Sequence, residues 1–129
     1  MLILSVDDDQ LFRQELKRLL EGTREVHVVE AEDGEDGLRL ARELRPDIVL
    51  MDIAMPRLNG LEATRQIKAA QPETKVIVLT IHDEAPYRKA ARESGADAFL
   101  AKKTVAGGLI PAIGSLVARF PGKPEGDSS

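Results

Sequence analysis

The chain has 129 residues, of which 43% are hydrophobic and 31% charged, so one globular domain is expected. It contains no cysteine, which excludes a disulfide scaffold or a thiolate metal site and suits a cytoplasmic location. A net charge of −4, no basic stripe and an aromatic content of only 3% argue against direct nucleic-acid binding, and no apolar run reaches the length of a membrane span.

Five short apolar segments have the length of β-strands. Each is apolar almost throughout instead of alternating with polar residues, which predicts strands buried on both faces, as in a parallel sheet. In chain order these segments cover residues 2–6, 26–31, 47–51, 76–80 and 98–101.

The segments between and after these strands carry apolar residues at helical spacing, so five helices are predicted. Asp9 is expected to cap the first helix, and Gly22 and Gly95 follow helix ends, where a left-handed residue is favoured. The five apolar faces comprise Phe12, Leu16, Leu19 and Leu20; Leu38, Ala41 and Leu44; Leu61, Thr64 and Ile67; Tyr87, Ala90, Ala91 and Ser94; and Leu109, Ile113, Leu116, Val117 and Phe120.

Strands and helices that alternate in this way predict right-handed crossovers and a doubly wound α/β fold with helices on both faces of the sheet. We expect the strand order 2-1-3-4-5, which is common among such sheets. Residues 1–120 form the predicted domain, and the Pro-, Gly- and Ser-rich residues 121–129 are expected to be a flexible tail or the start of a linker. The last helix contains Gly107, Gly108 and Pro111, so we expect it to start late, kink at Pro111 or dock loosely.

Acidic residues end two strands that this order makes neighbours. Asp7 and Asp8 follow the first strand, and Asp52 follows the third. Ligand sites in open α/β sheets lie at the carboxyl ends of the strands, where the strand order reverses, so these carboxylates are expected to converge. Because their charges repel, we expect a hard cation there, and Mg²⁺ prefers carboxylate ligands together with phosphate oxygens.

The same edge of the sheet carries groups suited to phosphoryl chemistry. A carboxylate such as Asp52 can act as a nucleophile toward phosphorus. Thr80 ends the fourth strand and Lys102 follows the fifth, and their hydroxyl and ammonium groups can contact phosphoryl oxygens. Taken singly, each residue has a simpler interpretation: helix capping for the acids, strand propensity for Thr80 and solvation for Lys102.

Four motifs carry a resemblance to a known family. "ILSVDDD", "IVLMDIAMPRLNGLEA", "VIVLTIHD" and "SGADAFLAKKT" resemble the receiver domain of bacterial two-component response regulators, most of all the LuxR/NarL-type class. The resemblance implies that Asp52 accepts the phosphoryl group, and that Asp7, Asp8, Asp52 and the backbone carbonyl of Ala54 bind Mg²⁺. Asp8 would bind the ion directly and Asp7 through water. Thr80 and Lys102 would hold the phosphoryl group, with Thr80 and Phe99 as the switch pair.

The resemblance also implies partners and an output. A histidine kinase or a small phosphodonor would supply the phosphoryl group, and the face built from the fourth helix, fifth strand and fifth helix would change. A phosphorylation-dependent homodimer is one expected output. Another is transcription, with DNA bound only through a separate C-terminal domain absent from this chain. The domain would assist its own phosphorylation and dephosphorylation without being a metabolic enzyme.

Two positions differ from the family pattern, and other functions remain as alternatives. Ile81 stands where a small residue is common, which could narrow access to the site, and Lys103 replaces a frequent proline. A flavin-binding electron carrier would need a phosphate-cradling loop where the sequence has "DDD". A phosphohydrolase would often need a second acid at position 54, which is Ala54. A receiver used only as a constitutive interaction module is the fourth possibility.

Overall fold

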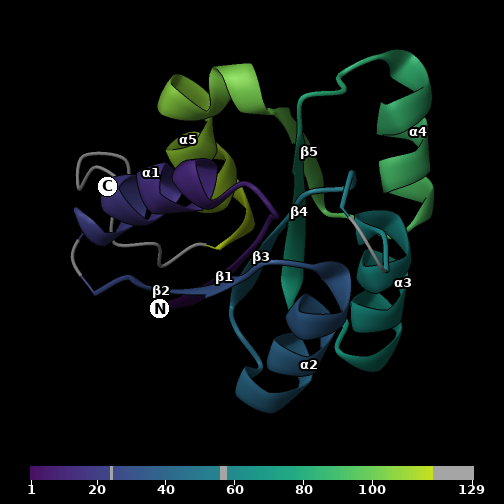
Figure 1. The fold of residues 1–129 in the computed structure, drawn as a ribbon, viewed down its shortest axis with the longest axis horizontal. Helices are drawn as coiled ribbons and strands as arrows, with labels where there is room; N and C mark the ends of the chain where they lie inside the picture. Colours follow the sequence, from purple (N-terminus) through teal and green to yellow (C-terminus); the bar gives the residue numbers. More distant parts are fainter. Residues whose placement is uncertain (24, 56–57, 118–129) are drawn as a thin grey trace.

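The computed structural model describes residues 1–23, 25–55 and 58–117, which contain five parallel strands in one sheet ordered β2-β1-β3-β4-β5. This is the predicted fold and the predicted strand order (Figure 1). The strands are β1 (Leu2–Val6), β2 (His27–Ala31), β3 (Ile48–Met51), β4 (Lys75–Thr80) and β5 (Ala98–Ala101). The helices in the described residues are α1 (Gln10–Glu21), α2 (Gly34–Leu44), α3 (Gly60–Ala70), α4 (Ala85–Glu93) and α5 (Val105–Leu116), with a short 3-10 turn, Lys102–Thr104, before α5.

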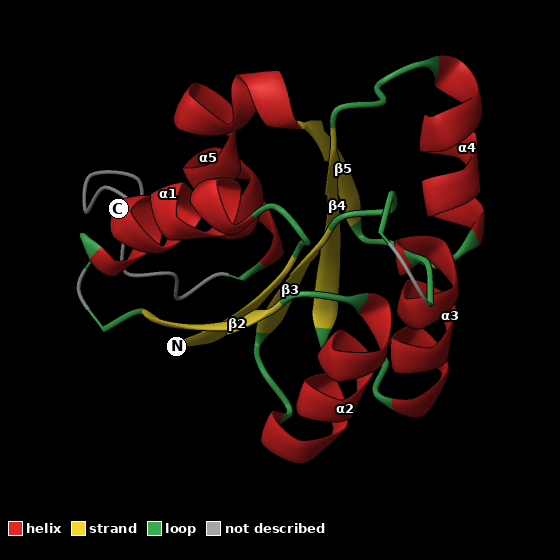
Figure 2. Ribbon diagram, in the orientation of Figure 1, coloured by secondary structure: helices red, strands yellow, loops and turns green. Residues whose placement is uncertain are grey.

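The helices cover the sheet from both sides, as Figure 2 shows. Helices α1 and α5 lie on one face, and α2, α3 and α4 lie on the other. Successive residues of a strand therefore enter different cores: in β4, Ile77 and Leu79 pack with α1 and α5, whereas Val76 packs with α2 and α3. Burial on both faces explains why the strand sequences do not alternate between apolar and polar residues.

The helix ends follow from local chemistry, with one correction to the predicted caps. Asp9 caps α1 as predicted, because its side chain accepts a hydrogen bond from the N–H of Phe12. Gly95 has φ 97°, the predicted left-handed conformation, whereas Gly22 has φ −69°, so that prediction is wrong there. The N–H of Gly22 instead donates to the carbonyl of Arg18 at 3.2 Å, and the N–H of Thr23 donates to that of Leu20 at 3.0 Å.

The last helix differs from its prediction in where it starts and in how it docks. It begins at Val105, directly after the 3-10 turn, and continues through Pro111, so it does not start late. Val105, Leu109 and Ile113 recur at intervals of four residues and are buried against the sheet. This apolar spacing outweighs the poor helix propensity of the two glycines. Phe120, the predicted domain end at residue 120 and the predicted tail at 121–129 lie outside the described residues.

Candidate functional site

The acidic side chains predicted to converge lie together at the carboxyl edge of the sheet. Strands β1 and β3 are paired with Val6 opposite Met51, so the residues that follow, Asp7 and Asp52, emerge side by side. The N–H of Asp52 donates to the carbonyl of Val6 at 3.0 Å, which fixes this register past the strand ends. One carboxylate oxygen from each of Asp7, Asp8 and Asp52 lies within 4.8 Å of the others.

The three carboxylates have different surroundings. Asp7 and Asp52 are 2% and 5% exposed, whereas Asp8 is open to solvent. Burial, and after it the negative charge of Asp7, raises the pKa of Asp52 to about 6 from 3.8. Lys102 and a hydrogen bond from the N–H of Ala54 to Asp52 Oδ1, 3.2 Å long, oppose that rise. Burial of Asp52 and the charge of Asp7 thus outweigh the effect of Lys102 on the pKa of this carboxyl.

Lys102 lies between the two buried acids. It follows β5 in the 3-10 turn, and its Nζ is 2.7 Å from Asp7 Oδ2 and 3.6 Å from Asp52 Oδ2. Burial alone would lower the pKa of Lys102, but the hydrogen bond with Asp7 and the charge of Asp52 raise it. The lysine therefore places a positive charge beside the carboxylates of Asp7 and Asp52.

Thr80 and Phe99 lie where the sequence predicts them. Thr80 is fully buried at the end of β4, and its Oγ1 accepts a hydrogen bond of 3.2 Å from the N–H of His82. Phe99, in β5 opposite Val78, is half-buried, with the guanidinium carbon of Arg88 4.9 Å from its ring centroid. The hydroxyl and the aromatic ring thus lie on the adjacent strands β4 and β5.

Three further residues support the site, and the sequence alone did not identify their roles. Arg13 is buried and donates to the backbone carbonyl of Asp7 and, at 2.9 Å, to Glu30 Oε1. Gly60 packs against the backbone of Asp52. Phe12 places its ring beside Lys102, with 4.4 Å from Nζ to the ring centroid. Only the Asn59-Gly60 turn signal pointed to one of them, because such dipeptides favour tight turns.

The donor set fits a hard divalent cation. It consists of carboxylate oxygens close enough to share one ion, and such ions favour oxygen ligands. Both oxygens of Asp7 already have partners, since Oδ1 accepts from the N–H of Asp9 at 2.9 Å and Oδ2 meets Lys102. Asp8 is the more open carboxylate. The cluster can therefore bind a metal ion between the ends of β1 and β3.

An open α/β sheet with a buried aspartate, neighbouring acids and a lysine at one edge is the arrangement that the resemblance to receiver domains implies. The family model described as "Response regulator receiver domain" matches residues 3–113. The chain belongs to this family, as its motifs suggested.

Known relatives agree with this assignment. The chain is 44% identical to the transcriptional regulatory protein DegU of Brevibacillus brevis and 42% identical to the response regulator GacA of Pseudomonas aeruginosa, each over 86% of the chain. It covers 48% of DegU and 52% of GacA, so it spans about half the length of the curated relatives it matches.

Solved structures show the same fold. A LuxR-family two-component response regulator from Aurantimonas sp. SI85-9A1 superposes with a TM-score of 0.85 and 32% identity, over 98% of this chain and 91% of that one. The receiver domain of NarL from Mycobacterium tuberculosis superposes with a TM-score of 0.77 and 32% identity, over 88% of this chain and 96% of that one. The predicted likeness to LuxR/NarL-type regulators is thus confirmed. None of the helices in the described part of the chain has the length and apolar character that a membrane crossing needs.

Proposed function

We propose that Asp52 accepts a phosphoryl group from a histidine kinase or from a small phosphodonor such as acetyl phosphate. The observation that carries this proposal is the buried carboxylate of Asp52, which faces the ammonium of Lys102 at 3.6 Å beside Asp7. An oxygen of Asp52 attacks phosphorus and forms a new O–P bond. The bond from phosphorus to the donor's imidazole nitrogen or acetate oxygen breaks, and its electron pair leaves with the donor.

The other residues would stabilise the charge that develops on the phosphoryl oxygens. Lys102 Nζ can contact one of them, and the hydroxyl of Thr80 can donate to another. Asp7, Asp8, Asp52 and the carbonyl of Ala54 would hold Mg²⁺, with Asp8 as a direct ligand and Asp7 acting through water. The bound ion would supply positive charge against the phosphoryl oxygens.

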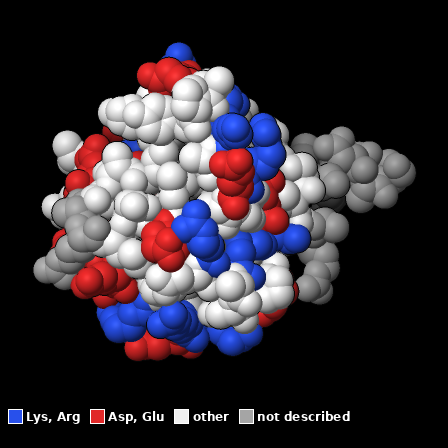
Figure 3. Space-filling view, turned by 90° about the vertical axis from the view of Figure 1, so that its right-hand side faces the viewer, with Lys and Arg blue, Asp and Glu red and all other residues white. Residues whose placement is uncertain are grey.

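Phosphorylation would change a neighbouring surface. Thr80 would turn toward the phosphoryl group, and Phe99 would follow by turning inward, which repacks the face made by α4, β5 and α5. On the side of the molecule that carries α3 and α4, Lys and Arg side chains lie beside Asp and Glu side chains (Figure 3). This mixture of charges favours a protein partner, such as a second copy of the chain, over direct contact with DNA.

The output would be transcription through a separate DNA-binding domain, as the name of the DegU relative suggests. The domain itself would act on no metabolite. It would assist only the gain and loss of its own phosphoryl group.

Phosphoryl incorporation tests the proposal. Purified chain is incubated with Mg²⁺ and acetyl phosphate, and the mass increase is mapped by intact and peptide mass spectrometry. We expect incorporation at Asp52, its loss with a chelator and its loss in Asp52→Asn. Glu93→Gln, which removes an exposed acid from α4, is the charge-matched control. Undiminished incorporation in Asp52→Asn would refute the assignment.

A further inference from the structure

We propose that Phe12 is a positioning residue for the phosphoryl-transfer reaction, because the face of its ring holds the ammonium of Lys102 against Asp52. This inference rests on the function proposed above. The observation behind it is the contact between Lys102 Nζ and the Phe12 ring, at 4.4 Å from the centroid. A cation within about 6 Å of an aromatic face is attracted by the negative charge of the π system.

The ammonium of Lys102 is surrounded on three sides. Asp7 Oδ2 lies at 2.7 Å, Asp52 Oδ2 at 3.6 Å, and the ring of Phe12 occupies a further side. The Lys102 side chain is 13% exposed, so little water competes for the ammonium. Cation–π attraction strengthens when the cation is desolvated. Unlike the two acids, the ring attracts the ammonium without taking a proton from it or binding a metal ion.

The ring itself is held in place by the backbone around the site. Phe12 lies in the first turn of α1, where its N–H donates to the capping oxygen of Asp9 at 3.2 Å. The next residue, Arg13, donates to the carbonyl of Asp7. The segment between β1 and α1, which carries Asp7 and Asp8, thus also fixes the start of α1. The ring position is coupled to the acidic cluster through a few covalent bonds and two hydrogen bonds.

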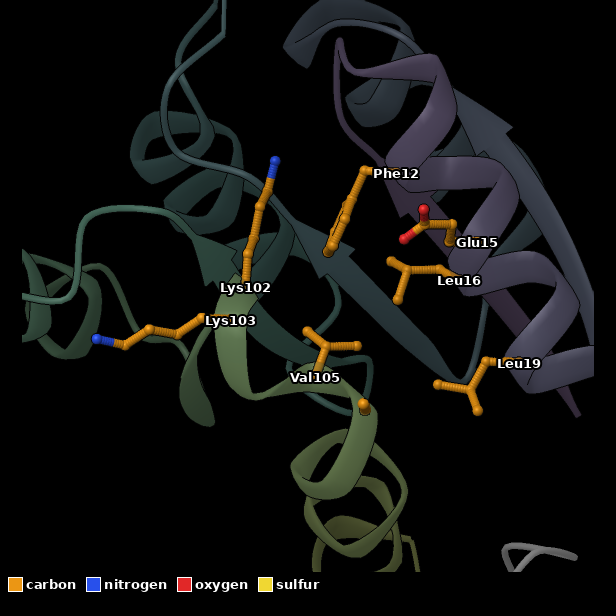
Figure 4. A pocket seen from close by; sticks show the side chains of 8 residues that line it. Phe12, Glu15, Leu16, Leu19, Lys102, Lys103 and Val105 are labelled. Carbon is orange, nitrogen blue, oxygen red and sulfur yellow. The ribbon is translucent and has the colours of Figure 1, made fainter.

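Burial separates Phe12 from the core residues on the same helix face. Leu16 and Leu20 are 2% and 0% exposed, whereas Phe12 is only half-buried, at the margin of that core. Figure 4 shows its ring alongside the Lys102 side chain, whose nitrogen points away from Val105 and Leu19. A role limited to core packing does not require this orientation toward the lysine.

A cavity next to Phe12 and Lys102 explains why the lysine needs the ring to position its ammonium. A space of about 310 Å³ lies between α1 and the start of α5, and both Phe12 and Lys102 line it. Leu16, Leu19 and Val105 form its apolar walls. Without the ring, the flexible four-carbon chain of Lys102 gains room there, and the ammonium is less often at Asp52. Preorganisation of this cation is the property that transition-state stabilisation depends on.

Fluorination of the ring is the sharpest test, because it removes the π-face charge while nearly preserving ring size. We expect Phe12→trifluorophenylalanine to lower the rate of phosphorylation by acetyl phosphate about three- to tenfold, with mono- and difluoro rings in between. The phosphorylation rate of Phe12→Leu should fall by a similar factor, and Phe12→Tyr should retain the wild-type rate within about twofold. Leu11→Ala, which shortens a neighbouring α1 side chain that is 72% exposed and does not line the cavity, is the control and should leave the rate unchanged.

A spectroscopic measurement without metal or phosphodonor gives independent evidence. In the wild-type chain, the ε-CH₂ protons of Lys102 should resonate upfield because they lie near the ring face. They should return toward their ordinary position in Phe12→Leu. A wild-type rate in the trifluoro variant, or unshifted Lys102 protons in the wild type, would overturn the proposal. If wild-type protein does not incorporate phosphoryl at Asp52, the proposed function fails instead, while the proton shift still reports the contact.

Discussion

Lys102 Nζ lies 2.7 Å from Asp7 Oδ2, so the cation of the site is paired with one of the carboxylates that would otherwise face a metal ion. The ammonium is also 3.6 Å from Asp52 Oδ2. The positive charge of Lys102 would repel a divalent ion. The ammonium also takes up Oδ2 of Asp7, an oxygen that could otherwise contact such an ion. Under the proposed function, the same lysine would therefore assist phosphoryl transfer and weaken metal binding.

Removing this charge should strengthen metal binding. We expect Lys102→Met to bind Mg²⁺ about three- to tenfold more tightly, since the repulsion between close charges is lost. Isothermal titration calorimetry measures the dissociation constant. Lys103→Met removes the same charge from a side chain that is 76% exposed and should change the affinity by less than about twofold. Equal or weaker binding by Lys102→Met would contradict the competition.

The raised pKa of Asp52 makes the stability of the metal-free chain depend on pH. The carboxyl titrates near 3.8 when unfolded and near 6 when folded, so the folded state holds the proton more tightly between these values. The free energy of unfolding should therefore fall as pH rises from about 4 to above 6, by at most about 3 kcal/mol. Urea denaturation with a chelator present measures this change.

Replacing the acid removes that dependence. Above pH 7, Asp52→Asn should be more stable than the wild type without metal, and the difference should shrink toward pH 4. Saturating Mg²⁺ should shrink it as well, because the ion binds the folded wild-type carboxylates. Glu93→Gln should follow the wild-type pH profile. If the free energy of unfolding of Asp52→Asn changed with pH as steeply as that of the wild type, another group would be the cause of the pH dependence.

The start of α3 has no room for a side chain at position 60. A Cβ on Gly60 would lie 2.0 Å from the carbonyl oxygen of Asp52, so Gly60→Ala must displace the backbone of Asp52, the proposed acceptor. We expect a loss of about 1–3 kcal/mol in unfolding free energy and slower phosphorylation. Gly107→Ala is the matched control: its Cβ meets nothing within 4 Å inside α5, so it should be neutral or stabilising by up to about 1 kcal/mol.

Arg88 connects the aromatic ring of Phe99 to the loop between β4 and α4. Its guanidinium carbon lies 4.9 Å from the ring centroid, and its Nε donates to the carbonyl of Asp83 at 3.0 Å. We expect Arg88→Ala to raise amide hydrogen exchange in residues 81–84 about two- to fivefold. Lys89→Ala, an exposed neighbour on α4, should leave exchange in this loop unchanged. Unchanged exchange in Arg88→Ala would show that the contact does not hold the loop.

The sequence was sufficient for those site residues that directly follow an apolar strand. Asp7, Asp52 and Lys102 could be placed because a parallel sheet brings all its carboxyl ends to one edge. The contact of Phe12 with Lys102 could not be predicted, because helical spacing shows only that Phe12 belongs to an apolar face. Which strand end that face meets depends on how α1 packs beside the start of α5.

Backbone details depended on tertiary context in the same way. Gly22 predicted a left-handed end for α1, but the left-handed conformation is found at Arg45, the C-cap of α2, with φ 47°. The start of α5 was also misjudged, since Gly107 and Gly108 suggested a weak helix. Propensity describes an isolated segment, whereas the burial of Leu109 and Ile113 decides the outcome in the folded chain.

The pairing of β1 with β3 determines when a growing chain can first form the complete acidic site. Asp7 and Asp52 belong to segments far apart in sequence, and between them the chain forms α1, β2, α2 and β3. A growing chain that stops short of β3 therefore carries half of an acidic pocket and lacks Asp52, the proposed acceptor. On the proposed function, only a correctly assembled sheet would be labelled by a phosphodonor, so labelling itself would serve as an assay for native topology.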